Sequence, residues 1–238
     1  MSADTKRFQT LFMERGPLVE EAKALRRKIF FKDTGKDEDQ FDEFCTHVIV
    51  IDKDTNGVVG TYRLLLGSIA KEKCGFYSET EFDLENIKQN CKGQVLEMGR
   101  ACVRESYRQY PILNFMWKQI YSYIIKNKIQ YLIGCASIEN PSPHKIGRII
   151  KFFQNNYFSP VAFRVFPLEG KRYRCLKAQG DFDPKKIGEE LPSLVKSYLK
   201  AGAWVCGDPA WDKIFGVVDF FMMLDMNRMD STFTKKLL

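Results

Sequence analysis

The sequence predicts an α/β fold, and three features carry this prediction. Residues 94–104 (Gln-Val-Leu-Glu-Met-Gly-Arg-Ala-Cys-Val-Arg) form a largely apolar run typical of a buried strand. Asn56-Gly57 separates two other apolar runs, which indicates an antiparallel hairpin. Strand-type and helix-type segments then alternate over 94–166, as in right-handed crossovers. A chain of 238 residues can bury one substantial core, so we expect a single domain over 1–238, with 171–238 as an extension packed on that core.

The elements expected before the central strand follow from apolar spacing and turn residues. A helix is expected over 16–31, where Pro17 suits the first turn and apolar residues recur every three or four positions. The other expected segments are a polar connector, two strands joined by the hairpin turn, and a mixed, loop-like stretch: 30–44, 47–52, 58–66 and 67–93.

After the central strand, helices and strands are expected to alternate. The expected helices are 112–128, 141–155 and 192–201, the last closed by Gly202. The expected strands are 130–136, 161–166 and 215–224, with connections at 105–111 and 171–186.

Composition narrows the class of protein. The apolar fraction of 45% and the charged fraction of 28% are ordinary for a globular protein. The start of the chain lacks the apolar segment of a signal peptide, and no apolar run approaches the ~20 residues that cross a bilayer. Seven cysteines and two histidines show no ligand spacing, so we expect no disulfide framework, no metal site and no tightly bound cofactor. These features predict a cytoplasmic protein.

The net charge of +7 is concentrated in one segment. Residues 101–177 hold 13 Lys and Arg against 3 Asp and Glu. This surplus is either a solvated face or a basic face for nucleic acid, an anionic membrane or an acidic carrier protein. No helix-turn-helix, zinc-finger or stacked-aromatic motif accompanies it, so we expect no nucleic acid partner.

The central strand carries two charges that need an explanation. Burying Glu97 or Arg100 without a partner is costly, and alternation along a strand would point them to opposite faces. A bulge at Gly99 would turn both to one side and would free backbone N–H groups to polarise a carbonyl. A structural ion pair inside a sheet is the other interpretation. We favour a catalytic strand.

Three more polar residues fall on apolar elements. Arg26 lies on the apolar side of its expected helix, where it either binds a carboxylate or extends its head to the helix edge. Arg63 lies inside an apolar strand, and His47 opens the preceding strand. A lone histidine in such a place is more often structural than catalytic.

Six segments, in order, carry a family likeness: 24–30 (Ala-Leu-Arg…Phe), 41–47 (Phe-Asp-Glu-Phe-Cys-Thr-His), 60–65 (Gly-Thr-Tyr-Arg-Leu-Leu), 97–103 (Glu-Met-Gly-Arg-Ala-Cys-Val), 134–137 (Gly-Cys-Ala-Ser) and 198–210 (Tyr-Leu-Lys-Ala-Gly-Ala…Cys-Gly…Pro-Ala). Together they resemble the bacterial ornithine Nα-acyltransferases of ornithine-lipid synthesis, sometimes called haemolysin-like. That group belongs to the GNAT acyltransferase superfamily and is similar to the acyl-homoserine-lactone synthases.

The resemblance implies a fold and a reaction. The implied fold is a GNAT-like mixed, mostly antiparallel sheet, splayed at a bulged central strand, with helices on both faces. The implied reaction moves a 3-hydroxyacyl chain from the phosphopantetheine thioester of acyl carrier protein to the α-amine of L-ornithine, giving lyso-ornithine lipid. Acyl carrier proteins are acidic, which suits the basic segment. A lipid product also suggests peripheral contact of the basic face with the inner face of the membrane.

One absence favours the carrier protein as donor. GNAT enzymes that use coenzyme A usually carry a glycine-rich loop after the central strand, whose backbone N–H groups bind the pyrophosphate. Residues 104–111 occupy that place and contain no glycine. A donor without the adenosine diphosphate end would not need such a loop.

The expected catalytic groups come from the central strand. Glu97 is the expected base for the α-amine, and backbone N–H groups at 98–100, Gly99 included, are the expected donors to the oxyanion. Ser137, His47 and solvent are the alternatives for the acid that protonates the leaving thiol, and we count both side chains among the substrate-binding candidates.

The expected acceptor site uses the remaining charges. Arg63 or Arg100 is expected to bind the acceptor carboxylate, and Asp42 is expected to receive its side-chain ammonium. Arg26 is expected to order Asp42 or Glu97. Four aromatic residues line the acyl channel or belong to the plain core: Phe152, Phe153, Tyr157 and Phe158.

Two other functions compete with this reading of the residues. The autoinducer synthases share the pattern of charged residues, so an autoinducer-type synthase, or a GNAT enzyme with another amine acceptor, is the first alternative. A non-enzymatic membrane-binding protein is the second.

Overall fold

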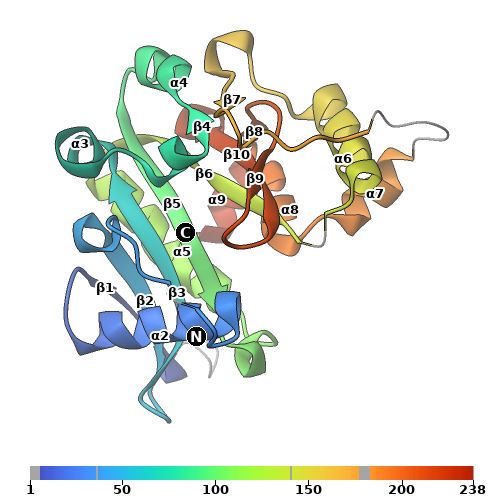
Figure 1. Ribbon diagram of the computed structural model, residues 1–238. Helices are drawn as coiled ribbons and strands as arrows, with labels where there is room; N and C mark the ends of the chain where they lie inside the picture. Colours follow the sequence, from blue (N-terminus) through green and yellow to red (C-terminus); the bar gives the residue numbers. More distant parts are fainter. Residues whose placement is uncertain (1–5, 36, 140, 177–182, 238) are drawn as a thin grey trace. The chain divides into compact units, whose positions relative to one another are not determined.

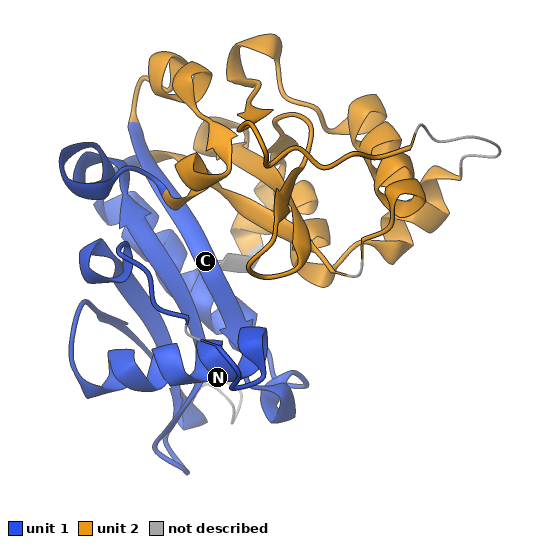
Figure 2. Ribbon diagram, in the orientation of Figure 1, with its two compact units in different colours: residues 1–76, 94–129, 236–238 blue, residues 77–93, 130–235 orange. Residues whose placement is uncertain are grey.

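The computed structural model describes residues 6–35, 37–139, 141–176 and 183–237, which fall into two compact units (Figures 1 and 2). Unit 1 comprises 1–76, 94–129 and 236–238, and unit 2 comprises 77–93 and 130–235. The expectation of a single domain with a C-terminal extension stays a prediction. Of the expected connection at 171–186, residues 177–182 lie outside the described residues.

Unit 1 contains four antiparallel strands in the order β1 (Phe8–Met13), β2 (Thr46–Asp52), β3 (Gly57–Leu66) and β5 (Gln94–Val103). The hairpin expected at Asn56-Gly57 joins β2 to β3, and Asn56 adopts a left-handed conformation there (φ 54°). Strand β1 was not expected from the sequence. Among the described residues it pairs only with β2, and most of its side chains are only partly buried, so it lacks a clear apolar pattern.

Helices cover both faces of this sheet. Helix α2 (Pro17–Phe31) packs on one face through a cluster made of Val19, Ala22, Leu25, Ile49, Val58 and Cys102. Helix α5 (Ile112–Lys126) packs on the other face, where Trp117 meets the ring of Tyr62 at 6.5 Å between centroids. Alternate residues of β2 and β3 therefore face opposite helices, which explains why both strands are apolar almost throughout.

Strand β5 contains the expected bulge, but its centre is not at Gly99. Thr61 pairs with Cys102 and Arg63 pairs with Gly99, so Tyr62 alone faces Arg100 and the residue after it. Arg100 adopts a left-handed conformation (φ 54°), whereas Gly99 does not. The expectation rested on the conformational freedom of glycine. In the structure the arginine takes the unusual dihedral, and the ion pairs of its side chain hold it there.

Unit 2 is built on β10 (Val217–Asp225), which pairs antiparallel with β6 (Ile129–Ile138), β8 (Trp204–Val205) and β9 (Ala210–Asp212). A second pair joins β4 (Phe82–Asp83) to β7 (Phe166–Pro167). The helices of this unit are α4 (Glu85–Asn90), α6 (Pro143–Asn156), α7 (Pro184–Glu190), α8 (Ser193–Ala201) and α9 (Ser231–Leu237, whose last residues belong to unit 1). Helix α8 ends at Gly202 in a left-handed cap (φ 99°), as expected.

Two expectations need correction. The strand expected over 161–166 is wrong: Val161–Phe163 forms a short 3-10 helix, and pairing begins only at Phe166. Pro160 fixes the backbone before this turn, and its carbonyl accepts from the Phe163 N–H. The loop-like stretch 67–93 contains β4, α4 and the short helix α3 (Gly67–Ile69), which continues into a π-helical turn.

Gly60 tests the packing of α5 on the sheet. A Cβ at this position would lie 2.6 Å from Cγ2 of Ile112, so Gly60→Ala should lower the free energy of unfolding by about 1–3 kcal/mol in urea titrations. Ile112→Leu in the same chain should recover part of the loss, because leucine lacks that branch. At Gly57 an added Cβ meets nothing closer than 3.5 Å, so Gly57→Ala is the control. Equal effects of the two alanines would contradict this packing.

Candidate active site

Three arginines of unit 1, all named as candidates above, converge on three aspartates. The arginines are Arg26, Arg63 and Arg100, and the aspartates are Asp37, Asp39 and Asp42. Helix α2 presents the first arginine from its buried side, and β3 and β5 present the other two. Their side chains are 0%, 5% and 12% exposed. Charges buried this deeply require opposite charges in contact, and the network supplies them.

Arg26 is the most deeply buried member. Its Nε donates to Asp37 Oδ2 at 2.6 Å, and its Nη1 donates to Asp42 Oδ1 at 2.7 Å. Its Nη2 donates to Asp42 Oδ2 and to the backbone carbonyl of Asp37. The guanidinium therefore contacts carboxylates and does not extend to the helix edge. It holds the connector between α2 and β2 against the sheet.

Asp39 bridges the other two arginines. Its Oδ1 accepts from Arg63 Nη1 at 2.7 Å, and its Oδ2 accepts from Arg100 Nη2 at 3.0 Å. Arg63 also donates to Asp42 Oδ1 at 3.1 Å, and Arg100 Nε lies 3.1 Å from Asp37 Oδ1. The Asp39 side chain is 21% exposed, more than its two partner aspartates. The two guanidiniums thus form a place where one carboxylate fits, at the open edge of the network.

The network determines the protonation of its buried members. Burial acts to raise the pKa of the Asp42 carboxyl, but hydrogen bonds and charge from Arg26, and then Arg63, outweigh it and hold that pKa well below its usual range. Burial lowers the pKa of His47, so its imidazole is neutral near pH 7. Its Nε2 lies 3.3 Å from the Asp42 carbonyl, which assigns the proton to Nε2 as donor. His47 is fully buried, so it contacts the network and not solvent.

Glu97 and Gly99 lie on the same sheet face as Arg63. In the register of β3 and β5, Arg63 pairs with Gly99 and Leu65 pairs with Glu97, so all share one side of the pleat. A Cβ added at Gly99 would meet nothing within 4 Å, which leaves open space beside Arg63. Burial raises the pKa of the neighbouring Cys45 thiol to about 12, so Cys45 is unsuited to act as a nucleophile.

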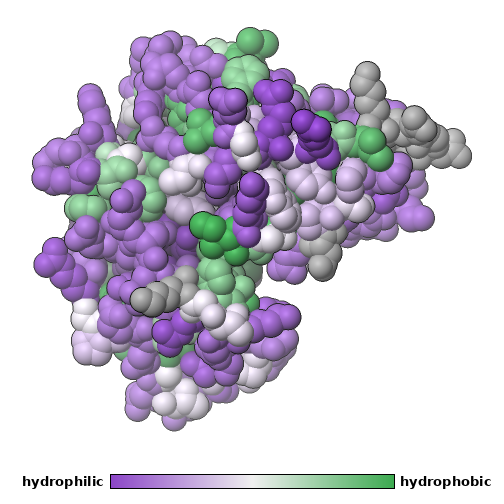
Figure 3. Space-filling view, viewed as in Figure 1, coloured by the Kyte–Doolittle hydropathy of each residue, from purple (hydrophilic) through white to green (hydrophobic). Residues whose placement is uncertain are grey.

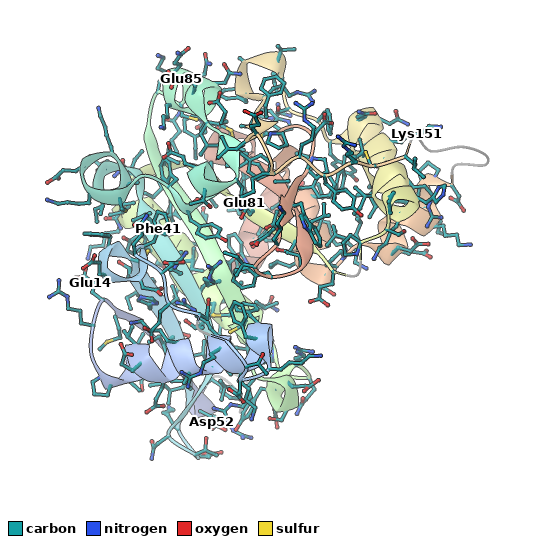
Figure 4. All side chains as sticks on the ribbon, in the orientation of Figure 1. Glu14, Phe41, Asp52, Glu81, Glu85 and Lys151 are labelled. Atoms are coloured by element: carbon teal, nitrogen blue, oxygen red, sulfur yellow. The ribbon has the colours of Figure 1, made fainter. Side chains whose placement is uncertain are left out.

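An acidic hollow of about 390 Å³ adjoins this network at the start of α2. Its carboxylates are Glu14, Glu20, Glu38, Asp39, Asp42 and Glu43, against the two cations Arg15 and Lys23. Figure 4 labels Glu14 at this part of unit 1. An excess of carboxylates in a concave site attracts a cationic group.

The remaining candidates belong to unit 2. Ser137 is an exposed residue of β6, opposite Asp219 of β10. Phe153 is fully buried, and its ring lies 5.1 Å from that of Phe220 and also packs on Tyr157. These ring contacts are those of a core.

Sequence reasoning missed Asp37 and Asp39. They lie in the connector that was expected only to be polar, and nothing in their spacing marks them. The available signal was a charge argument: three arginines expected on apolar elements require as many carboxylates, and Asp37-Glu38-Asp39 is the nearest acidic run to Arg26.

Comparisons with known proteins show the family of this chain. Residues 19–118 match the model of the acetyltransferase (GNAT) domain. The L-ornithine N(alpha)-acyltransferase of Brucella abortus (strain 2308) is 30% identical over 240 residues, which cover 90% of this chain and 83% of that protein. The chain belongs to the L-ornithine N(alpha)-acyltransferase family. The chain is also 29% identical to the L-ornithine N(alpha)-acyltransferase of Agrobacterium fabrum (strain C58), and the match covers 87% of this chain and 70% of that protein.

A solved structure agrees at the level of fold. FeeM, an N-acyl amino acid synthase from uncultured soil microbes, superposes with a TM-score of 0.55 at 9% identity, over 93% of this chain and 92% of FeeM. This chain therefore has the mixed, mostly antiparallel GNAT-like α/β fold that the resemblance implied. The protein is an acyltransferase, and GNAT acyltransferases take the acyl group from a thioester. Within the described ranges, none of the helices has the length and apolarity to cross a bilayer.

Asp42→Asn tests the charge balance of the network. Removing this carboxylate leaves Arg26 and Arg63 short of a partner, and breaking such a pair costs roughly 3–5 kcal/mol of unfolding free energy at pH 7. Because folding lowers the pKa of Asp42, the stability due to its charge is complete above the unfolded pKa of about 3.9 and is lost as pH falls toward the folded pKa.

The difference between wild type and variant should therefore shrink below about pH 4 in urea titrations. Glu43 is the exposed neighbour of Asp42 and provides the control, since Glu43→Gln should unfold like wild type at every pH. A difference that stays constant with pH would contradict the assignment.

Proposed function

We propose that this acyltransferase moves a 3-hydroxyacyl chain from acyl carrier protein to the α-amine of L-ornithine, giving lyso-ornithine lipid. The observation that carries the proposal is the carboxylate place between Arg63 and Arg100, which Asp39 fills, beside the open space at Gly99. An amino acid offers a carboxylate of the same chemistry. The family supports ornithine as that amino acid.

The acceptor carboxylate takes the place of Asp39 between the two arginines. Asp39 is the partly exposed member of the network, so it is the carboxylate that exchanges most readily. Asp39 then faces the acidic hollow and, with it, receives the side-chain ammonium of ornithine. Asp42 was the expected partner of that ammonium, but it is buried and held by Arg26 and Arg63, so Asp39 suits this role better.

The reaction joins one C–N bond and breaks one C–S bond. The Glu97 carboxylate takes one proton from the α-ammonium, and the free amine attacks the thioester carbon. Backbone N–H groups at 98–100 stabilise the oxyanion. When the intermediate collapses, the proton on Glu97 passes to the leaving thiolate, and the second proton of the amine passes to water. Gly99 leaves the space in which the carbonyl is placed.

The segment after β5 supports a carrier-protein donor. Residues 104–111 form tight turns, in which the N–H groups of Tyr107, Arg108 and Tyr110 donate to carbonyls of the same segment. Those N–H groups are not directed outward as a pyrophosphate cradle. Lys145, Arg148 and Lys151 recur every third residue along one side of α6, where they suit an acidic partner (Figure 4 labels Lys151).

We place the protein in the cytoplasm, with peripheral contact at the inner face of the membrane. Within the basic segment, Val161 and Phe166 are exposed apolar side chains, a combination that suits an anionic lipid surface. On the face drawn in Figure 3, hydrophobic side chains gather only in small separate groups. Such contact is weak and reversible, as release of a lipid product requires.

The catalytic assignment is tested with the purified protein, 3-hydroxyacyl carrier protein and ornithine, followed by mass spectrometry of the amide. Glu97→Gln should lower the rate by at least about 100-fold. Gly99→Ala should also lower it without lowering the thermal midpoint, because its Cβ enters open space. Glu105→Gln, in an exposed position, is the matched control. Wild-type turnover by Glu97→Gln would rule out its role as base. With the same acyl chain on coenzyme A, the wild type should react more slowly.

The acceptor site is tested with ornithine analogues. Norvaline lacks the side-chain ammonium and putrescine lacks the carboxylate, so both should react more slowly than ornithine. Arg100→Ala should raise KM for ornithine and norvaline but not for putrescine, because only the first two carry the carboxylate it binds. Arg108→Ala, on the exposed turn after β5, is the control. If S-adenosylmethionine is the preferred acceptor, the protein is an autoinducer-type synthase and the proposal fails.

A further inference from the structure

Unit 2 buries three carboxylates that the proposed reaction does not use. Glu81, Asp212 and Asp219 are 1%, 2% and 3% exposed. One oxygen of each lies within 4.8 Å of the others. The three residues are far apart in the sequence, so no ligand spacing marks them. Figure 4 labels Glu81.

The fold of unit 2 brings them together. Asp219 pairs with Ala210, and Asp212 pairs with Val217, so the two aspartates are diagonal neighbours on one face of the β9–β10 hairpin. The segment that carries Glu81 is fixed at its backbone: the Glu81 N–H donates to the Ser78 carbonyl, and the Glu81 carbonyl accepts from the Leu168 N–H. The cluster is therefore held by the strand pairing and not by the carboxylates themselves.

Among the described groups that act on Glu81, Lys171 is the one cation, and it only partly offsets the burial of Glu81 and the charges of Asp219 and Asp212. In the described part of the chain, neither oxygen of Glu81 accepts a hydrogen bond from a conventional donor, and neither Glu81 nor Asp212 belongs to a salt bridge. Asp212 is fixed by the N–H groups of Ile214 and Phe215 and by the Tyr77 hydroxyl. Burial, and then the charges of Asp219 and Asp212, raise the pKa of Glu81 to about 9.

We propose that Glu81, Asp212 and Asp219 bind a divalent cation that prefers oxygen ligands, Mg²⁺ or Ca²⁺. Oxygen ligands at about 2.1–2.5 Å from such an ion lie within about 5 Å of one another, which the cluster already satisfies. A proton shared between Glu81 and Asp219 would satisfy only one Glu81 oxygen. A bound cation provides a partner for both and balances the charge of the aspartates. The ion ties the β9–β10 hairpin to the segment before β4, a role that goes beyond the proposed acyl transfer.

The test measures cation binding by the full chain after treatment with EDTA and gel filtration. Titration calorimetry with MgCl₂ and, separately, CaCl₂ should show one site per chain with a Kd below about 1 mM for at least one of the ions. The same ion, in excess over Kd, should raise the thermal midpoint. Glu81→Gln keeps the shape of a protonated glutamate, so it should fold, and its affinity should fall at least ten-fold.

Glu169→Gln is the matched control, since it makes the same change at an exposed position of the same unit and should bind like wild type. Asp219→Asn is the second variant and should also lose affinity, with folding checked by circular dichroism. The proposal is overturned if the wild type binds neither ion, or if Glu81→Gln and Asp219→Asn bind as tightly as wild type.

Discussion

The buried network of three arginines and three aspartates is the interaction on which this sheet face of unit 1 depends. Buried guanidiniums are tolerated only where carboxylates contact them, and here three of each balance within one sheet face. The same contacts hold the connector after α2 against the sheet and keep Arg100 in a left-handed backbone conformation. In the proposed function, stability and substrate recognition therefore use the same charges. Asp39, at the exposed edge, is the member that the proposed substrate carboxylate would replace with least loss of structure.

The bulge in β5 places the Arg100 side chain on the same sheet face as Glu97 and Arg63. Without the extra residue, Arg100 would face away from Glu97 and Arg63, and the carboxylate place would not form. A left-handed arginine costs roughly 1–2 kcal/mol, and two ion pairs of its side chain offset this cost. Gly99 is not needed for the unusual dihedral. It leaves open space on the sheet face beside Arg63.

The sequence predicted most elements of unit 1 and the convergence of several charges, because apolar periodicity and charges on apolar segments are local signals. The bulge was expected one residue early, since glycine freedom is visible in sequence and ion-pair stabilisation is not. Asp39 and the cluster around Glu81 were missed, because their neighbours in space come from distant segments. Asp37 was missed because nothing in its spacing marks it, although its partner Arg26 is near in the sequence. Strand β1 and the turn at Val161 escaped for a different reason. Within the described residues, strand β1 pairs with a neighbour on one side only, so its apolar pattern is weak. The residues at 161–166 have the composition of a strand, but Pro160 fixes the backbone for a turn.

A crystal structure of the protein with L-ornithine bound tests the central claim most directly. The account predicts the ornithine carboxylate between the guanidiniums of Arg63 and Arg100, with Asp39 turned away from both and the side-chain ammonium in the acidic hollow. It is contradicted if Asp39 still bridges the two arginines while ornithine is bound at another place.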